Sequence, residues 1–206
     1  MWLNIKLILL FSLLGFSRLS AQEKPDSIST KTEKYNRFLV YAGVNRNFST
    51  GDGFISDAYD LSFGGELGLD FMITKNLLIG FQFDLLKATA TKPEDLAGVQ
   101  ETKIISSSLH LGYKYYFSNL LFLNLTGGFG HARYSNKASF GRKFHDDAFF
   151  LYAKPKLGYT FDENWSFYLA AAIRNDKLRI ETTPDFEDYF DNSTRIPISL
   201  GIQLGF

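Results

Sequence analysis

The sequence has no cysteine and only three histidines among its 206 residues. Without cysteine the chain can form neither disulfides nor thiolate metal sites, and it cannot carry a lipid anchor on cysteine. The histidines, His110, His131 and His145, fall on different predicted elements, which is a weak basis for a metal site. The net charge is zero, with 22 basic and 22 acidic residues, so there is no electrostatic basis for binding nucleic acid. We therefore predict no cofactor, no metal and no nucleic-acid partner.

Long hydrophobic runs are also scarce, and a mean hydropathy of −0.09 argues against a helical membrane protein. The one apolar run, Leu7–Phe16, is too short to cross a bilayer as a helix. Lys6 precedes this run and the small residue Ala21 follows it, so we predict a cleaved signal peptide over residues 1–21, with an uncleaved anchor as the alternative. Residues 22–36 are polar and show no apolar periodicity, which predicts a flexible periplasmic lead-in before a single domain, residues 37–206.

Aromatic residues are abundant, with 21 Phe and 11 Tyr. In the last segment, Arg195–Phe206, every even position from Ile196 onward is large and apolar, and every odd position is small, polar or proline. A period of two indicates a β-strand whose two faces differ. The same alternation predicts seven earlier strands, at 37–48, 61–73, 77–86, 105–117, 121–130, 149–161 and 165–174.

The connections between these strands alternate in length. Short turns lie at 74–76, 118–119 and 162–164, and longer loops lie at 49–59, 89–101, 135–147 and 175–194. Aromatic residues gather near the short turns, where an interfacial girdle belongs. This asymmetry is typical of an all-β, eight-stranded antiparallel up-and-down transmembrane barrel with short periplasmic turns and long extracellular loops.

A soluble barrel of lipocalin type shows the same alternation, but with its apolar face inward. The glycines favour the membrane barrel, because they share the polar face and small residues belong where eight strands leave little room. These glycines are Gly64, Gly68, Gly80, Gly112, Gly128, Gly130, Gly158, Gly201 and Gly205. Pro155 lies in the middle of a predicted strand, where it cannot donate to the ladder, so we expect a bulge or a local gap there.

The polar face also carries charges of both signs. An unpaired charge in a narrow lumen costs several kcal/mol, so these side chains are expected to pair and to fill the barrel as a rigid polar plug. A gated pore or a proton path is the alternative. The predicted network consists of Glu66, Asp70, Asp84, His110, Lys114, Lys154, Lys156 and Arg174.

The segment Gly130–Asn136 bears a partial resemblance to the His-x-Ser-Asn motif of eight-stranded outer-membrane lipid A deacylases. Here Arg133 stands where that motif has its histidine, and His131 lies four residues before Ser135. Four residues along a strand separate two side chains by roughly 13 Å, which is too far for a hydrogen bond. We therefore predict that the protein is not an enzyme, with lipid modification as an alternative.

Two of the predicted loops carry side chains suited to contacts at the cell surface. In the loop 135–147, Lys137, Arg142, Lys143 and His145 could meet phosphates of the outer leaflet, although exposed bases are common. The loop 175–194 could bind Ca²⁺, a protein partner or lipopolysaccharide, or could be an ordinary solvated loop. Its candidate interaction residues are Asp185, Phe186, Glu187, Asp188, Tyr189, Phe190 and Asp191.

Over residues 37–206 the chain resembles the small outer-membrane β-barrels of Gram-negative bacteria, of the OmpA, OmpX and opacity-protein type. The resemblance implies residence in the cell outer membrane among lipids and lipopolysaccharide. It also implies insertion by the barrel assembly machinery, which recognises a last strand ending in an aromatic residue, here Ile202, Leu204 and Phe206. It further implies a role in envelope integrity, adhesion or surface binding. We thus expect a non-enzymatic barrel whose role lies in its loops.

Overall fold

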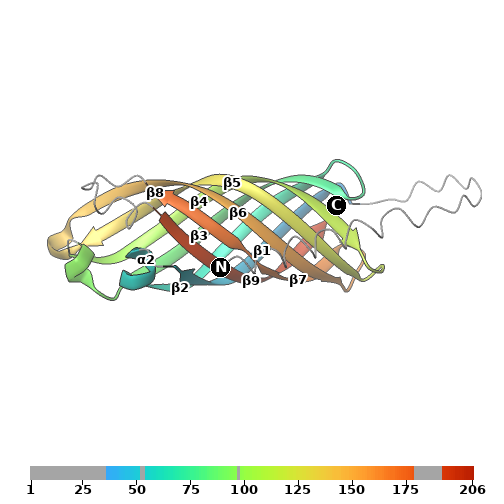
Figure 1. Cartoon of the computed structure of the whole chain (residues 1–206). Coiled ribbons are helices and arrows are strands. Elements are labelled where there is room, and N and C mark those ends of the chain that lie inside the picture. The colour runs from blue at the N-terminus through green and yellow to red at the C-terminus, as the bar shows by residue number, and fades with distance from the viewer. Residues whose placement is uncertain (1–35, 52–53, 97, 179–191) are drawn as a thin grey trace, which may run out of the picture. The chain divides into compact units, whose positions relative to one another are not determined.

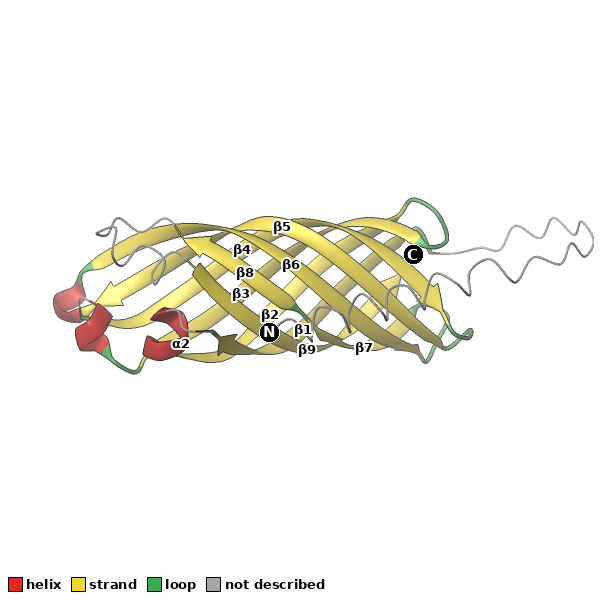
Figure 2. Cartoon of the chain, viewed as in Figure 1, coloured by secondary structure: helices red, strands yellow, loops and turns green. Residues whose placement is uncertain are grey.

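Antiparallel β-strands make up most of the chain in the computed structural model, which describes residues 36–51, 54–96, 98–178 and 192–206. Figures 1 and 2 show these strands crossing obliquely around one closed barrel. The predicted signal peptide and all of the predicted lead-in except Asn36 lie outside the described residues. Within the described ranges, no helix has the length and apolar character needed to cross a membrane.

Each strand pairs with the next one along the chain, and the first pairs with the last. β7 and β8 are two parts of one strand that lies between β6 and β9, so the ring has eight strands as predicted. A short helix, α2 (Phe54–Ala58), and two 3₁₀ turns, η1 (Pro93–Leu96) and η2 (Ser139–Gly141), lie in the connections at the extracellular end. The strands are β1 (Phe38–Thr50), β2 (Tyr59–Met72), β3 (Leu77–Ala90), β4 (Val99–Tyr116), β5 (Leu121–Ala138), β6 (Lys143–Thr160), β7 (Trp165–Ala171), β8 (Ile173–Leu178) and β9 (Asn192–Gly205).

The last strand closes the barrel, as predicted. β9 pairs with β1 without a register shift, from Leu39 opposite Gly205 to Thr50 opposite Thr194. Beyond the ladder, the Phe206 carbonyl accepts from the Arg37 amide at 2.8 Å. Because the ring is closed, neither terminal strand has an unpaired edge facing lipid.

The periplasmic turns are tight, and two of them have the same local design. The hydroxyl of Thr74 accepts from the amide of Leu77 at 3.0 Å, and the hydroxyl of Ser118 accepts from the amide of Leu121 at 3.1 Å. A hydroxyl that bonds to a nearby amide stabilises a turn against the alternative of continuing the strand. These bonds account for two of the sharp reversals that the sequence predicted.

The break between β7 and β8 has a cause in two prolines on the neighbouring strands. By the register, Pro155 of β6 faces Ala171 and Pro197 of β9 faces Ala172. Each proline lacks an N–H and so removes one hydrogen bond from the ladder. The register is the same on both sides of the break, so Pro155 is accommodated by a local gap and not by a bulge.

Within the membrane the two faces of the wall differ as predicted. Large apolar side chains on the outer face are widely exposed, including Phe63 at 71% and Leu200 at 60%. The predicted lumen glycines lie in crowded positions: a Cβ at Gly68 would collide with the Tyr41 ring. On the outer face, a Cβ at Gly65 would meet nothing closer than 3.8 Å. Lumen glycines therefore make room for the larger side chains that fill the barrel.

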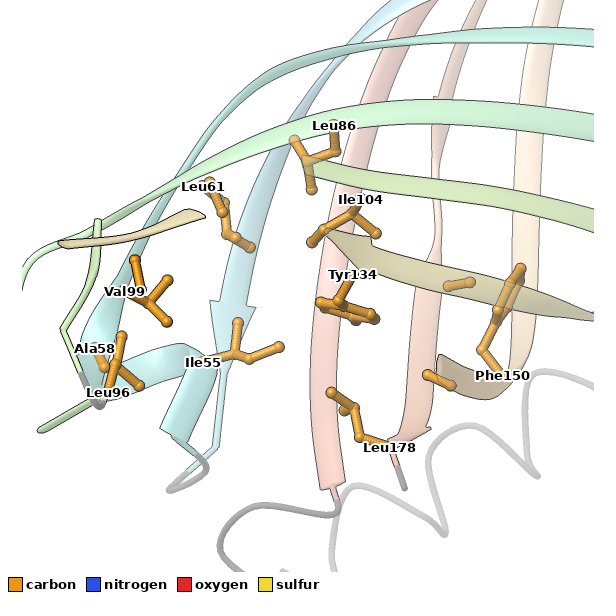
Figure 3. Packing of buried hydrophobic residues seen from close by; sticks show 14 residues of the cluster. Ile55, Ala58, Leu61, Leu86, Leu96, Val99, Ile104, Tyr134, Phe150 and Leu178 are labelled. Atoms are coloured by element: carbon orange, nitrogen blue, oxygen red, sulfur yellow. The ribbon is translucent and has the colours of Figure 1, made fainter. Parts of the chain in front are cut away.

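The strands extend further at the extracellular end than the sequence predicted. The predicted loop 135–147 is wrong, because β5 continues to Ala138 and β6 begins at Lys143; the strands likewise extend into 89–101 and 175–194. Beyond the lipid band the polarity of the two faces is reversed, so that Arg133 points outward while Tyr134 is buried inside. The inward side chains pack into an apolar cluster (Figure 3) of Ile55, Ala58, Leu61, Leu86, Ala88, Leu96, Val99, Ile104, Ala132, Tyr134, Ala138, Ala148, Phe150 and Leu178.

Candidate functional site

The centre of the lumen is organised around the Glu66 carboxylate on β2. Lys154 of β6 lies with its ammonium 3.0 Å from both carboxylate oxygens, and both side chains are buried. The hydroxyls of Tyr168 and Ser199 donate to the same carboxylate at 2.7 and 2.8 Å. One carboxylate therefore joins β2 to three strands on other parts of the ring, and its charge is fully compensated.

A second group lies nearer the periplasmic end, around Asp70. Its Oδ1 is 2.8 Å from Nε2 of His110, and its Oδ2 is 3.6 Å from the ammonium of Lys156. The other imidazole nitrogen of His110 lies 3.0 Å from the Tyr152 hydroxyl. The imidazole thus links a carboxylate to a phenol and has no free nitrogen left for a ligand.

A third group includes two charged residues that the sequence reading did not assign to the lumen, Asp176 and Arg195. Asp176 accepts from Arg174 at 2.7 Å, from Arg195 at 2.5 Å and from the Tyr134 hydroxyl at 2.7 Å. The guanidinium of Arg174 also lies 3.4 Å from the centre of the Phe150 ring. This group therefore joins the polar lumen to the apolar cluster above it.

Asp84 connects the first group to the third. It accepts from Gln82 at 2.7 Å, and Gln82 in turn accepts from Lys154 at 3.1 Å. Asp84, Arg174 and Arg195 line a polar cavity of about 20 Å³. A space of that size holds about one water molecule.

Lys114 is placed differently from the other predicted lumen bases. It is buried, yet among the described residues it has no carboxylate within 4.0 Å. Its ammonium lies 3.9 Å from the centre of the Phe122 ring and 5.0 Å from that of Tyr116. Aromatic faces thus take the place of the expected acidic partner at the periplasmic end.

The structure places the eight predicted network residues on the lumen side, in the groups described above, with Asp84 half-buried and the other seven buried. Two of the predicted assembly residues lie on the outer face of β9, where Ile202 is exposed and Leu204 is half-buried, and the third, Phe206, follows β9 and is exposed. The predicted loop residues 185–191 lie outside the described part of the chain. No group of three or more His, Asp or Glu side chains within the described residues could hold a metal ion.

Ser135 has a histidine partner, although not the one considered from the sequence. Its hydroxyl lies 3.1 Å from Nδ1 of His145, which faces it across the β5–β6 pair. His131 lies instead 3.4 Å from Asp147, whose Oδ1 also contacts Arg133 at 3.3 Å. Among the described residues no carboxylate orients His145, so the pair lacks the third group of a hydrolytic triad.

A closed eight-stranded ring with apolar side chains outside, a polar lumen and short turns at one end is an outer-membrane β-barrel. The family model of the outer membrane protein beta-barrel domain matches residues 9–203, and the chain belongs to this family. The protein accordingly resides in the cell outer membrane, surrounded by outer-membrane lipids and lipopolysaccharide.

Solved structures of similar fold share little sequence with this chain. Neisserial surface protein A is 15% identical with a TM-score of 0.57, covering 82% of this chain and 97% of its own. The attachment invasion locus protein Ail of Yersinia pestis is 13% identical with a TM-score of 0.54, covering 84% and 100%. A major outer membrane protein of Thermus thermophilus is 13% identical with a TM-score of 0.56, covering 82% and 98%. A search of curated sequences finds no match.

Proposed function

We propose that the protein is a non-enzymatic outer-membrane barrel with a sealed lumen, which carries a surface-interaction role on its extracellular loops. The sealed lumen is supported above all by the Glu66 group. In it, side chains from β6, β7 and β9 donate hydrogen bonds of 2.7–3.0 Å to the Glu66 carboxylate of β2. Beyond the Asp176 group, the apolar cluster fills the extracellular part of the barrel. Each layer opposes the passage of ions for its own reason: the first holds its charges in pairs, and the second fills its space mostly with apolar side chains.

The surface role is supported by where the chain exposes polar groups and by the proteins that share its fold. One of these is named for attachment and invasion and has been crystallised with the heparin analogue sucrose octasulfate. Because the sequence identity is low, the similarity extends to the fold alone. Binding experiments on the loops of this chain would identify its partner. Assembly through the outer face of β9 and the following residue, Phe206, belongs to the same proposal.

Conductance across a planar lipid bilayer tests the sealed lumen. The purified mature protein is expected to give no current steps. Lys154→Ala removes the ammonium from the central group and is the variant in which a leak would first appear. Steady conductance of the wild-type protein, increased by Lys154→Ala, would establish a narrow pore and overturn the proposal.

Hydrolysis of lipid A in detergent micelles tests the absence of enzymatic activity. The Ser135 and His145 pair brings a nucleophile and a base within hydrogen-bond distance on the described outer face, at the level of the headgroups. We expect no release of fatty acid from either the wild-type protein or Ser135→Ala. Release by the wild-type protein that is abolished by Ser135→Ala would make the protein a lipid-modifying enzyme.

A further inference from the structure

Basic side chains gather on the outer surface of four adjacent strands, β3 to β6, directly beyond the lipid-facing band. We call Lys87, Lys103, Arg133, Lys137 and Lys143 the lysine patch. The register places them in neighbouring rows: Lys103 lies opposite Lys87 on one side and Ser135 on the other, and Lys137 lies opposite Lys143. All five are exposed. The patch is therefore a continuous surface and does not depend on the conformation of a loop.

The patch contains two cross-strand pairs of like charge, Lys87 with Lys103 and Lys137 with Lys143. Like charges directly opposite each other destabilise a sheet unless an anion lies between them. Two acids lie among these side chains: Glu101 contacts Lys87 at 2.9 Å and lies opposite Lys137, and Asp147 contacts Arg133 at 3.3 Å. The other three lysines form no ion pair within 4.0 Å with any residue that the structure describes. Lys103 in one pair and Lys143 in the other thus keep a positive charge with no acid in contact among the described residues.

The position of the patch indicates which anion it meets. The lipid-facing residues Leu85, Phe129 and Phe149 lie just below it on the same strands. On β1 and β2, across the barrel, the base Arg46 is paired with Asp60 at 3.4 Å, and the exposed outer face of β8 adds the single base Lys177. A one-sided basic surface at the upper boundary of the lipid band faces the headgroups of the outer leaflet.

The spacing of the two pairs defines the headgroup more closely. Their midpoints are two strands apart and two residues apart along the strands. With about 4.8 Å between strands and about 3.4 Å per residue, the midpoints are roughly 12 Å apart. We propose that the lysine patch binds an outer-leaflet glycolipid that carries two phosphate groups, one at each lysine pair. Ser135 and His145 continue the row of the first pair across β5 and β6, two residues below the second pair, where they can donate to the sugar that joins the phosphates.

This inference goes beyond the proposed function, since it requires neither a sealed lumen nor a particular role for the loops. The test uses the full mature protein in micelles, with binding measured for diphosphoryl lipid A, monophosphoryl lipid A and a soluble sulfated saccharide at one ionic strength. The variant Lys103→Gln/Lys143→Gln removes one ammonium from each pair. Lys177→Gln, on the outer face of β8 opposite Phe149 and outside both lysine pairs, is the matched control.

We expect the wild-type protein to bind diphosphoryl lipid A most tightly and the double variant to lose about 25-fold in affinity, since each lysine near an anionic surface contributes about fivefold. Lys177→Gln should bind as the wild-type protein does. Heat-modifiable migration on a gel verifies that each variant is folded. Unchanged affinity of the folded double variant, equal binding of the monophosphoryl lipid, or tighter binding of the soluble saccharide would each overturn the inference.

Discussion

The central ion pair of the lumen allows a quantitative test of how the barrel is held together. Glu66→Gln keeps the shape of the side chain but removes its charge. Lys154, which is 4% exposed, would then keep only neutral acceptors, namely the Gln82 side-chain oxygen at 3.1 Å and the amide oxygen of the introduced side chain. Breaking one side of a buried ion pair costs about 3–5 kcal/mol, because the remaining charge is left uncompensated. We expect a loss of that size in the free energy of unfolding.

The double variant Glu66→Gln/Lys154→Met separates the cost of the orphaned charge from the loss of the hydrogen bonds. Methionine removes the ammonium and keeps most of its volume. The double variant should therefore be more stable than Glu66→Gln alone, with a coupling free energy of roughly 2–3 kcal/mol. This sign follows from the burial of both partners.

The assay is urea unfolding of the protein in vesicles, followed by tryptophan fluorescence. Asp60→Asn is the matched control, because it breaks the exposed ion pair with Arg46. Exposed pairs contribute about 0–1 kcal/mol, so the control should unfold nearly as the wild-type protein does. If Glu66→Gln loses no more stability than Asp60→Asn, the lumen pair is solvated and our reasoning is wrong.

Three further variants test other parts of the structure. Gly68→Ala should destabilise the barrel by about 1–3 kcal/mol, because its methyl group would meet the Tyr41 ring, whereas Gly65→Ala on the lipid face should cost little in the same unfolding assay. Tyr134→Phe should lose about 1.5–3 kcal/mol with the hydrogen bond to its buried carboxylate, and a midpoint equal to that of the wild-type protein would contradict this. Deleting Phe206 should lower the fraction of heat-modifiable protein in isolated outer membranes, and undiminished assembly would show that the terminal aromatic residue is dispensable.

Much of the barrel could be predicted from alternation alone. The period of two identified the lumen face of each strand within the lipid band, because lipid requires an apolar outer face along that whole length. The same argument identified β9 as the closing partner of β1, since an up-and-down barrel leaves it no other neighbour. The crowding around the lumen glycines followed from the small radius of eight strands.

The outer parts of the strands could not be recognised by that rule. Above the lipid band the outer face meets water and the inner face packs a core, so the polarity of the alternation is reversed where Arg133 and Tyr134 lie. For this reason the sequence does not assign Asp176 to the lumen: the residue lies beyond the lipid band, where the alternation predicts the loop 175–194. Arg195 could have been found, since it shares the parity of Ser199 and Gln203 in the same strand.

The pairing of acids with bases within the lumen could not be predicted from the sequence either. Glu66 and Lys154 are 88 residues apart, and which acid meets which base depends on the stagger of strands around the ring. Alternation places a side chain on a face but gives no height relative to strands across the barrel. The height of each side chain along the barrel axis is known only from the structure.

The most direct test of the central claim, a sealed lumen inside a lipid-facing wall, is the reactivity of introduced cysteines, for which the absence of native cysteine gives a clean background. Ser108→Cys places a thiol on the lumen side, where Ser108 is 3% exposed, and Lys137→Cys places one on the extracellular surface. With a small membrane-impermeant thiol reagent on intact cells, we predict rapid labelling of Lys137→Cys and no labelling of Ser108→Cys until the barrel is unfolded. Labelling of both thiols at similar rates in the folded protein would contradict the account.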